Sequence, residues 1–290
     1  MQSTIKLKSE ASWLSVPDDV RFVHCAVGEE FVDGSLGSWT ALLNDPYCSD
    51  GNCDVDATNR GLCVSSPGQI DRFAAAASDP CTTSSEGGAL ALHAIGDRAV
   101  SDAISAAHRW KRQHMMFRIE HATTLQQPAR IEAKRFASSR AIASIQGYEA
   151  QGCALFGHER LGEHRFNACA PHKTLSEAGA VLAMSSDWPV SPVDAIGNLQ
   201  SAVFRSEPDT GKTAALSEAL TAQDALHAYT TGSWQALGVS GVDDGLVEGD
   251  TADLVIWKIG CDPGTTDMLR HCSHTAFKTF VAGNCVHGCT

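Results

Sequence analysis

The stretch GALALHAIGDRAV, residues 88–100, decides the fold that this sequence predicts. Its apolar run reaches His93 and then breaks at an Ile-Gly-Asp-Arg turn. Beyond the turn, Val100, Ile104 and Ala107 fall at the helical spacing i, i+4 and i+7. A buried strand that ends in an imidazole and leads into a helix is typical of a parallel α/β fold.

The same alternation of strand and helix runs along much of the chain. Further strands are expected at 20–27, 115–122, 141–146 and 179–187, and helices at 67–79, 97–113 and 128–139. The runs at 141–146 and 179–187 are apolar without polar alternation, as in strands buried on both faces. With right-handed crossovers, these units predict a parallel α/β sheet.

Composition narrows the classes of partner and compartment. The 290-residue chain has a net charge of -12, which argues against nucleic acid or an anionic membrane as a partner. No run approaches the roughly 20 apolar residues of a membrane helix. The first residues lack the apolar core of a secretory signal. Eleven scattered cysteines, an odd count, predict no complete disulfide framework. We therefore expect a cytoplasmic, mostly reduced protein.

Three expected strands end in a potential metal ligand: His93, His121 and Asp187. The carboxyl ends of parallel strands meet at one edge, where reactive side chains gather. Two neutral imidazoles and a carboxylate suit Zn²⁺, and the carboxylate can instead accept a proton from activated water. Two alternatives stay open. Each histidine can be a hydrogen-bonded structural residue, and Asp187 can be a turn residue before Trp188.

Other cysteines and histidines are weaker candidates. Cys48, Cys53 and Cys63 lack a fourth ligand for a zinc site. Cys285 and Cys289, near the C-terminus, are expected to be free thiols. Five histidines on expected helices or loops should face solvent: His108, His114, His158, His164 and His172.

Seven segments together resemble a known family. They are FVDGSLGSWTALL (31–43), LHAIGDRAVSDAI (92–104), FRIEHA (117–122), ASIQ (143–146), LFGHER (155–160), LAMSSDWPVSPVDAIGNLQSAVFR (182–205) and EGDTADLVIW (248–257). In this order they look like the C-terminal two-thirds of amidohydrolase family 3. That family comprises metal-dependent hydrolases, among them N-substituted formamide deformylases.

The resemblance implies a distorted (β/α)8 TIM barrel that carries a metal centre, with a small β-sandwich built from both chain ends. By the order of its motifs, this chain is expected to hold strands four to eight. An incomplete barrel would cover residues 1–205. A helical segment and the C-terminal sandwich strands would occupy 206–290.

The resemblance also implies roles for four residues. His93 and His121 match the metal ligands of the fifth and sixth strands. Asp187 matches the acidic residue after the eighth strand, which binds metal and acts as general base. Glu29 stands where the family has a lysine, often carboxylated, four residues before the Asp-Gly pair. Its carboxylate can do part of what a carbamate does, the alternative being a surface charge at a strand end.

Two departures from the family pattern bear on activity: Glu29 at the lysine position, and the lack of a His-x-His pair, which in the family supplies two further ligands. A smaller departure lies in the family's Gln-Pro-x-His motif. There Gly147 and Glu149 replace the proline and the histidine, so any substrate contact made by that histidine should be lost or changed. Arg205 matches a family position and is expected to contact substrate or support structure.

Two functions follow from these expectations. The first is a metal-dependent amidohydrolase that acts on a non-peptide C–N bond of a small amide or formamide. It would hold one divalent ion, zinc, at Glu29, His93 and His121, beside Asp187. The second is a catalytically silent, truncated fragment or assembly module. Its open barrel would be covered by a second copy or by a separate N-terminal half.

Overall fold

The computed structural model describes residues 29–47, 58–78, 89–111, 115–239, 245–260, 269 and 272–289. Within these ranges a five-stranded parallel sheet has the order β1-β2-β3-β4-β5. Its strands are β1 (Glu29–Phe31), β2 (Ala89–Ala94), β3 (Met116–His121), β4 (Ile142–Gln146) and β5 (Val181–Ser185). The expected parallel α/β fold is confirmed. The strand expected at 20–27 lies outside the described residues.

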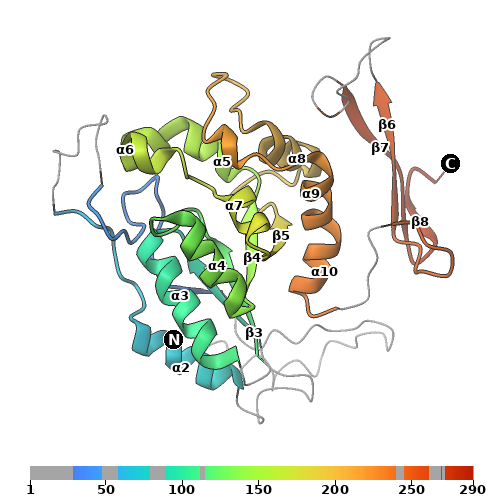
Figure 1. The fold of residues 1–290 in the computed structure, drawn as a ribbon. Coiled ribbons are helices and arrows are strands. Elements are labelled where there is room, and N and C mark those ends of the chain that lie inside the picture. Colours follow the sequence, from blue (N-terminus) through green and yellow to red (C-terminus); the bar gives the residue numbers. More distant parts are fainter. Residues whose placement is uncertain are drawn as a thin grey trace.

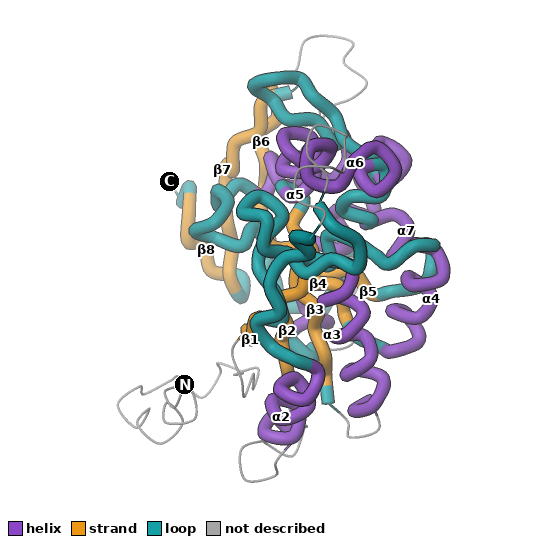
Figure 2. The backbone as a smooth tube through the Cα atoms, turned by 90° about the vertical axis from the view of Figure 1, so that its left-hand side faces the viewer, coloured by secondary structure: helices purple, strands orange, loops and turns teal. Residues whose placement is uncertain are grey.

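Helices follow the strands in the chain (Figure 1). Figure 2, seen from the side, shows α2, α3, α4 and α7 along one side of the sheet. The helices and helical turns are α2 (Pro67–Ser78), α3 (Asp97–Trp110), α4 (Ala129–Ser139), α5 (Glu149–Gly152), η3 (Cys153–Gly157), α6 (His158–Phe166), α7 (His172–Glu177), α8 (Ala195–Phe204), η4 (Leu216–Glu218), α9 (Ala222–His227), η5 (Ala228–Gly232) and α10 (Ser233–Ala236).

The core lies between the parallel sheet and its helices. All residues of β2 and β4 are buried, as their continuous apolar runs predict. Val100, Ile104 and Ala107 of α3 are fully buried against this sheet, which confirms the helical spacing read from the sequence. Burying a valine or isoleucine side chain contributes about 1.5–3 kcal/mol, so this face of α3 fixes the helix on the sheet.

The sheet does not close on itself among the described residues. β1 and β5 each pair with one neighbour in that part of the chain. Phe31 on β1 and Val181 on β5 expose 49% and 39% of their surface, respectively. A parallel five-stranded α/β sheet is therefore what the structure shows of the predicted barrel.

A second, antiparallel sheet lies toward the C-terminus, beside α9 and α10 in Figure 1. It consists of β6 (Leu254–Gly260), β7 (Ser273–Val281) and β8 (Asn284–His287). These strands coincide with those expected to return to a sandwich. Apolar side chains remain exposed on all three strands: Val255, Ile256, Ile259, Phe277, Val281 and Val286. No helix in the described ranges has the length and apolar character needed to cross a bilayer.

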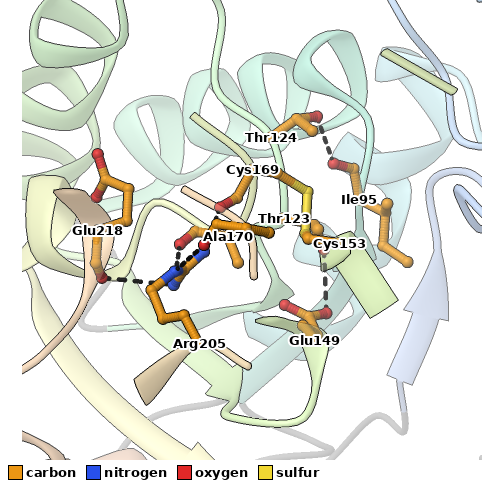
Figure 3. Close-up of a disulfide and its surroundings, with 10 residues drawn as sticks. Ile95, Thr123, Thr124, Glu149, Cys153, Cys169, Ala170, Arg205 and Glu218 are labelled. Carbon is orange, nitrogen blue, oxygen red and sulfur yellow. Dashed lines mark hydrogen bonds between the residues drawn. A yellow bond between two sulfur atoms is a disulfide. The ribbon is translucent and has the colours of Figure 1, made fainter. Parts of the chain in front are cut away.

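Arg205 is a structural residue buried in the body of the protein. Its guanidinium donates hydrogen bonds to the carbonyl oxygens of Cys169 at 2.6 Å and Ala170 at 3.1 Å (Figure 3). It also donates to the carbonyl of Ala214 at 2.8 Å. Burial lowers the pKa of Arg205 to about 10, so the group stays charged at neutral pH. Of the two roles expected for this arginine, the structure supports the structural one.

The expectation of mostly reduced thiols is wrong at five described cysteines, since Cys272 forms a disulfide in addition to the two pairs that follow. Cys153 in η3 is joined to Cys169 by a disulfide, and Cys285 is joined to Cys289. The first pair is 16 residues apart in sequence, and its Cα atoms lie 6.1 Å apart. Pairing depends on this approach in space, which the folded chain creates. Cys63 is an exposed free thiol, whereas Cys48 and Cys53 lie outside the described residues.

The prediction that His172 faces solvent is also wrong. The residue begins α7 and is completely buried, and neither ring nitrogen has a hydrogen-bond partner in the described structure. Burial, aided by the charge of Arg205, lowers the pKa of His172 well below its usual value of 6.5. The imidazole is therefore neutral in the folded protein.

This buried histidine predicts a loss of stability in mild acid. Because the pKa of His172 is lowered on folding, the unfolded chain binds the proton first, and stability falls as the pH drops below about 6.5. Urea unfolding at about pH 7.5 and about pH 5.5 should show wild type losing roughly 1.4 kcal/mol more than His172→Leu. The control Lys134→Gln, at an exposed position on α4, should lose as much as wild type. Equal losses in wild type and His172→Leu would contradict the prediction.

Candidate metal centre

Three potential ligands, one on each of the adjacent strands β1, β2 and β3, lie close together. Glu29, His93 and His121 each offer one ligand atom, and these three atoms all lie within 4.8 Å of one another. Oε1 of Glu29 is 3.4 Å from Nδ1 of His93 and 3.6 Å from Nε2 of His121. The structure thus brings together the three residues that the sequence predicted, and Glu29 is no isolated surface charge.

Hydrogen bonding fixes which nitrogen of His93 faces the cluster. Its Nε2 lies 3.1 Å from the carbonyl oxygen of Gly34, which can only accept. Nε2 therefore carries a hydrogen, and Nδ1 is the ring atom that faces Glu29. Phe31 stacks on the same ring with centroids 4.5 Å apart, which restricts ring rotation.

His121 is oriented in the opposite sense. Its Nδ1 lies 2.8 Å from Oε1 of Gln146 and 3.0 Å from Oε1 of Glu149. Both partners are acceptors, because the amide nitrogen of Gln146 faces the hydroxyl of Ser185. Nδ1 therefore carries a hydrogen, and Nε2 is the atom left for the cluster. The second nitrogen of each histidine is thus occupied, as is usual for metal-binding imidazoles.

The charges of the cluster are mutually dependent. Hydrogen bonds from His121 and His93 lower the pKa of Glu29 to about 2. Burial opposes a charge on His121, but hydrogen bonds to Glu149 and Glu29 outweigh it and raise the pKa of His121 well above 6.5. Without a metal, the cluster therefore holds an imidazolium beside carboxylates. A divalent cation at this point would replace that proton.

A buried carboxylate holds the loops around His93. Asp33, which follows β1, accepts hydrogen bonds from the backbone nitrogens of Leu42 at 2.8 Å, Ile95 at 3.0 Å and Gly96 at 2.8 Å. Burial raises the pKa of Asp33 to about 6, against the effect of these bonds. Gly96 has no room for a side chain, because a Cβ there would lie 2.0 Å from the carbonyl oxygen of Leu42.

Asp187 lies in the same cavity but outside the group of three. It follows β5 and lines a cavity of about 410 Å³ with Glu29, His93 and His121. Its negative charge contributes to the raised pKa of His121. Its carbonyl oxygen also accepts a hydrogen bond from Val190 at 2.8 Å, within a turn, and its φ of 56° is left-handed. Asp187 is therefore both a turn residue and a cavity residue.

Sequence analysis missed the residues that support the ligands. Asp33 and Gly34 form the Asp-Gly pair used only to locate Glu29, and no role was expected of either. Glu149 was noted only as a departure from a histidine. The one available signal was position, since Gln146 and Glu149 flank the end of β4.

The residues present fit a divalent metal. Two imidazoles and one carboxylate, with room for a further ligand, form a recognised catalytic zinc set. The parallel α/β fold and this set of potential ligands together indicate the class of metal-dependent hydrolases. Comparison with known proteins agrees, since the amidohydrolase family matches residues 6–287. This chain belongs to the amidohydrolase family.

Relatives in sequence are considerably longer than this chain. "Protein LONG AFTER FAR-RED 3" of Arabidopsis thaliana is 32% identical over 260 residues, which cover 87% of this chain and 41% of that protein. "Putative amidohydrolase YtcJ" of Bacillus subtilis is 29% identical over 260 residues, covering 89% of this chain and 46% of that protein. The chain therefore spans less than half the length of these relatives.

Two similar solved structures are described as uncharacterized metal-dependent hydrolases. One from Pyrococcus furiosus has a TM-score of 0.58 at 32% identity, and one from Pyrococcus horikoshii has a TM-score of 0.60 at 30% identity. Each match covers 72% of this chain and 39% of the other. The likeness supports a hydrolase-like function and a metal site.

The cluster predicts about one divalent ion per chain. After equilibration with Zn²⁺ and gel filtration, elemental mass spectrometry should find about one zinc in wild type. His93→Ala and His121→Ala should each lose most of it, because two ligand atoms cannot hold the ion as three do. His158→Ala removes an exposed histidine and should keep the wild-type content. Full zinc content in both cluster variants would show that the ion binds elsewhere.

Proposed function

We propose that this chain is a metal-dependent amidohydrolase that cleaves a non-peptide C–N bond in a small amide or formamide. The observation that carries the proposal is the convergence of Glu29, His93 and His121 on one point of a cavity. Membership of the amidohydrolase family supports it. The formamide deformylase-like subtype rests on the resemblance of the motifs.

One divalent ion, zinc, is the cofactor proposed for this site. Glu29 Oε1, His93 Nδ1 and His121 Nε2 would hold it. When bound, such an ion polarises a carbonyl group and lowers the pKa of water. A single ion is favoured over two, because the described residues bring only these three ligand atoms together.

Asp187 is the proposed general base. It lines the cavity beside the cluster, so its carboxylate can accept a proton from the attacking water. The water oxygen bonds to the carbonyl carbon, the C–N bond breaks, and the proton passes to the leaving nitrogen. Apolar side chains that include Phe31, Leu36 and Phe156 line the rest of the cavity and suit the apolar part of a small substrate.

Substitution of Asp187 separates a role as general base from a role as metal ligand. Asp187→Asn removes the proton acceptor but keeps the shape, so hydrolysis of an N-formyl or amide substrate should fall by about 10²–10⁴-fold. Zinc content should stay unchanged, since Asp187 lies outside the group of three ligand atoms. Asp209→Asn, at an exposed position, is the matched control and should retain full activity.

Loss of zinc along with activity in Asp187→Asn would make this residue a ligand rather than a base. Unchanged hydrolysis in a zinc-loaded variant would remove it from the mechanism. Absence of hydrolysis in zinc-loaded wild type across N-formyl and amide substrates would favour the alternative function below.

The second candidate is a catalytically silent assembly module. The observation that favours it is the apolar surface on β6, β7 and β8, together with the unpaired edges of β1 and β5 in the described structure. Exposed apolar sheets of this kind are covered in stable proteins. A second copy of the chain or a separate N-terminal half of the family fold would provide that cover.

A second copy predicts a dimer in solution. Light scattering after gel filtration should give about twice the 30.7 kDa of one chain. Phe277→Asp, in the middle of β7, should shift the mass toward the monomer, because it places a charge among exposed apolar side chains. The control Lys134→Asp, exposed on α4, should leave the mass unchanged. A stable wild-type monomer would contradict self-association through this sheet.

A further inference from the structure

Glu149 makes two contacts that tie it to the candidate metal centre. Its Oε1 lies 3.0 Å from Nδ1 of His121 and accepts a hydrogen bond from Oγ1 of Thr123, also at 3.0 Å (Figure 3 shows the second). The side chain is 15% exposed and lines the cavity. Glu149 thus joins the start of α5 to the end of β3 and to the segment that follows it.

We propose that Glu149 is the positioning residue for His121, holding its imidazole with Nε2 toward Glu29 and increasing its strength as a metal ligand. The proposal rests on the metal site of the proposed function and names a residue of that site. Glu149 acts through His121 rather than on substrate. A carboxylate that accepts the outer N–H of a ligand histidine fixes its orientation and raises its basicity.

The backbone around His121 explains why such a contact is needed. His121 has a φ of 71° and Ala122 a φ of 48°, so two successive residues with side chains are left-handed. Each such residue costs about 1–2 kcal/mol. Without side-chain contacts, this segment would relax and carry the imidazole away from Glu29. The bond from Thr123 to the same Glu149 oxygen holds the segment on its other side.

Glu149 is itself held by a rigid frame (Figure 3). Cys153, one helical turn beyond it, is joined by a disulfide to Cys169. Ala170, next to Cys169, donates its backbone N–H to the carbonyl oxygen of Thr123 at 2.8 Å. Buried Arg205 binds the carbonyls of Cys169 and Ala170. Thr123 and the helical turn that begins at Glu149 are therefore both connected to the segment that contains Cys169 and Ala170.

Gln146 shares Nδ1 of His121 but cannot replace Glu149. Its amide oxygen accepts from Nδ1 at 2.8 Å, while its amide nitrogen donates to Oγ of Ser185 at 3.2 Å. A neutral amide can orient the ring, whereas a carboxylate also adds negative charge beside it.

Zinc affinity tests the proposal. Competition with a chromogenic chelator should show Zn²⁺ binding weakened about 10–100-fold in Glu149→Ala. Glu149→Gln keeps the shape and one acceptor but loses the charge. Its affinity for zinc should therefore lie between those of wild type and Glu149→Ala. The matched control is Glu163→Ala, which breaks a bond of equal length, 3.0 Å, between Glu163 and exposed His158. That variant should bind zinc as wild type does.

A second readout follows the imidazole itself. In zinc-loaded protein with ¹⁵N-labelled histidine, the Nδ1–H proton of His121 should be protected from exchange in wild type and exchange faster in Glu149→Ala. Loss of that signal in His121→Asn assigns it. A variant that merely destabilised the fold would lower the unfolding temperature without this selective change at one ring.

The outcomes separate this inference from the proposed function. Wild type that binds no zinc would overturn both. Zinc binding by wild type with unchanged affinity and unchanged Nδ1–H exchange in both Glu149 variants would overturn only the role of Glu149. If Glu149→Ala fails to fold, Glu149→Gln decides, since wild-type affinity and exchange in that variant would exclude a contribution from the charge.

Discussion

The buried carboxylate of Asp33 is the contact on which the candidate site depends. It binds three backbone N–H groups, from Leu42, Ile95 and Gly96, and so joins the loop after β1 to the end of β2. Those two strands carry Glu29 and His93. If the Asp33 carboxylate were removed, these three N–H groups would lack their acceptor, each at a cost of about 1–3 kcal/mol. Asp33, which lies outside the group of three, thus connects the segments that carry two of the candidate ligands.

Parallel strand order accounts for the position of His121, the third candidate ligand. His121 lies on β3, the neighbour of β2, and Ala94 pairs with His121 in the register of these strands. Adjacent parallel strands end at one edge, so residues far apart in sequence approach one another there. The same geometry places Asp187, after β5, in the wall of the same cavity.

The polar groups that support the candidate site are connected by successive hydrogen bonds. Arg205 binds the loop that holds Cys169, this loop binds Thr123, and Thr123 binds Glu149. A buried arginine paired only with carbonyl oxygens would be costly without such complete bonding. These bonds connect buried Arg205 to the segment in which His121 has a left-handed backbone conformation.

Local pattern in the sequence determined the elements of the fold. Continuous apolar runs predicted β2, β4 and β5, helical spacing predicted α3, and the ends of two strands predicted His93 and His121 as neighbours. These features depend on residues close in sequence, where the periods of strand and helix act directly. Glu29 was found only through the family motif, because its local sequence alone is typical of a surface charge at the end of a strand.

Only the tertiary structure decided which polar groups meet. Contact between Glu149 and His121 spans 28 residues, and that between Ile95 and Asp33 spans 62. The burial of His172 and the Cys153–Cys169 bond overturned expectations based on local character. The physical reason is common to all of them. Hydrogen bonds and disulfides act over a few ångströms in space, and the packing of distant elements, not the local pattern, sets those distances.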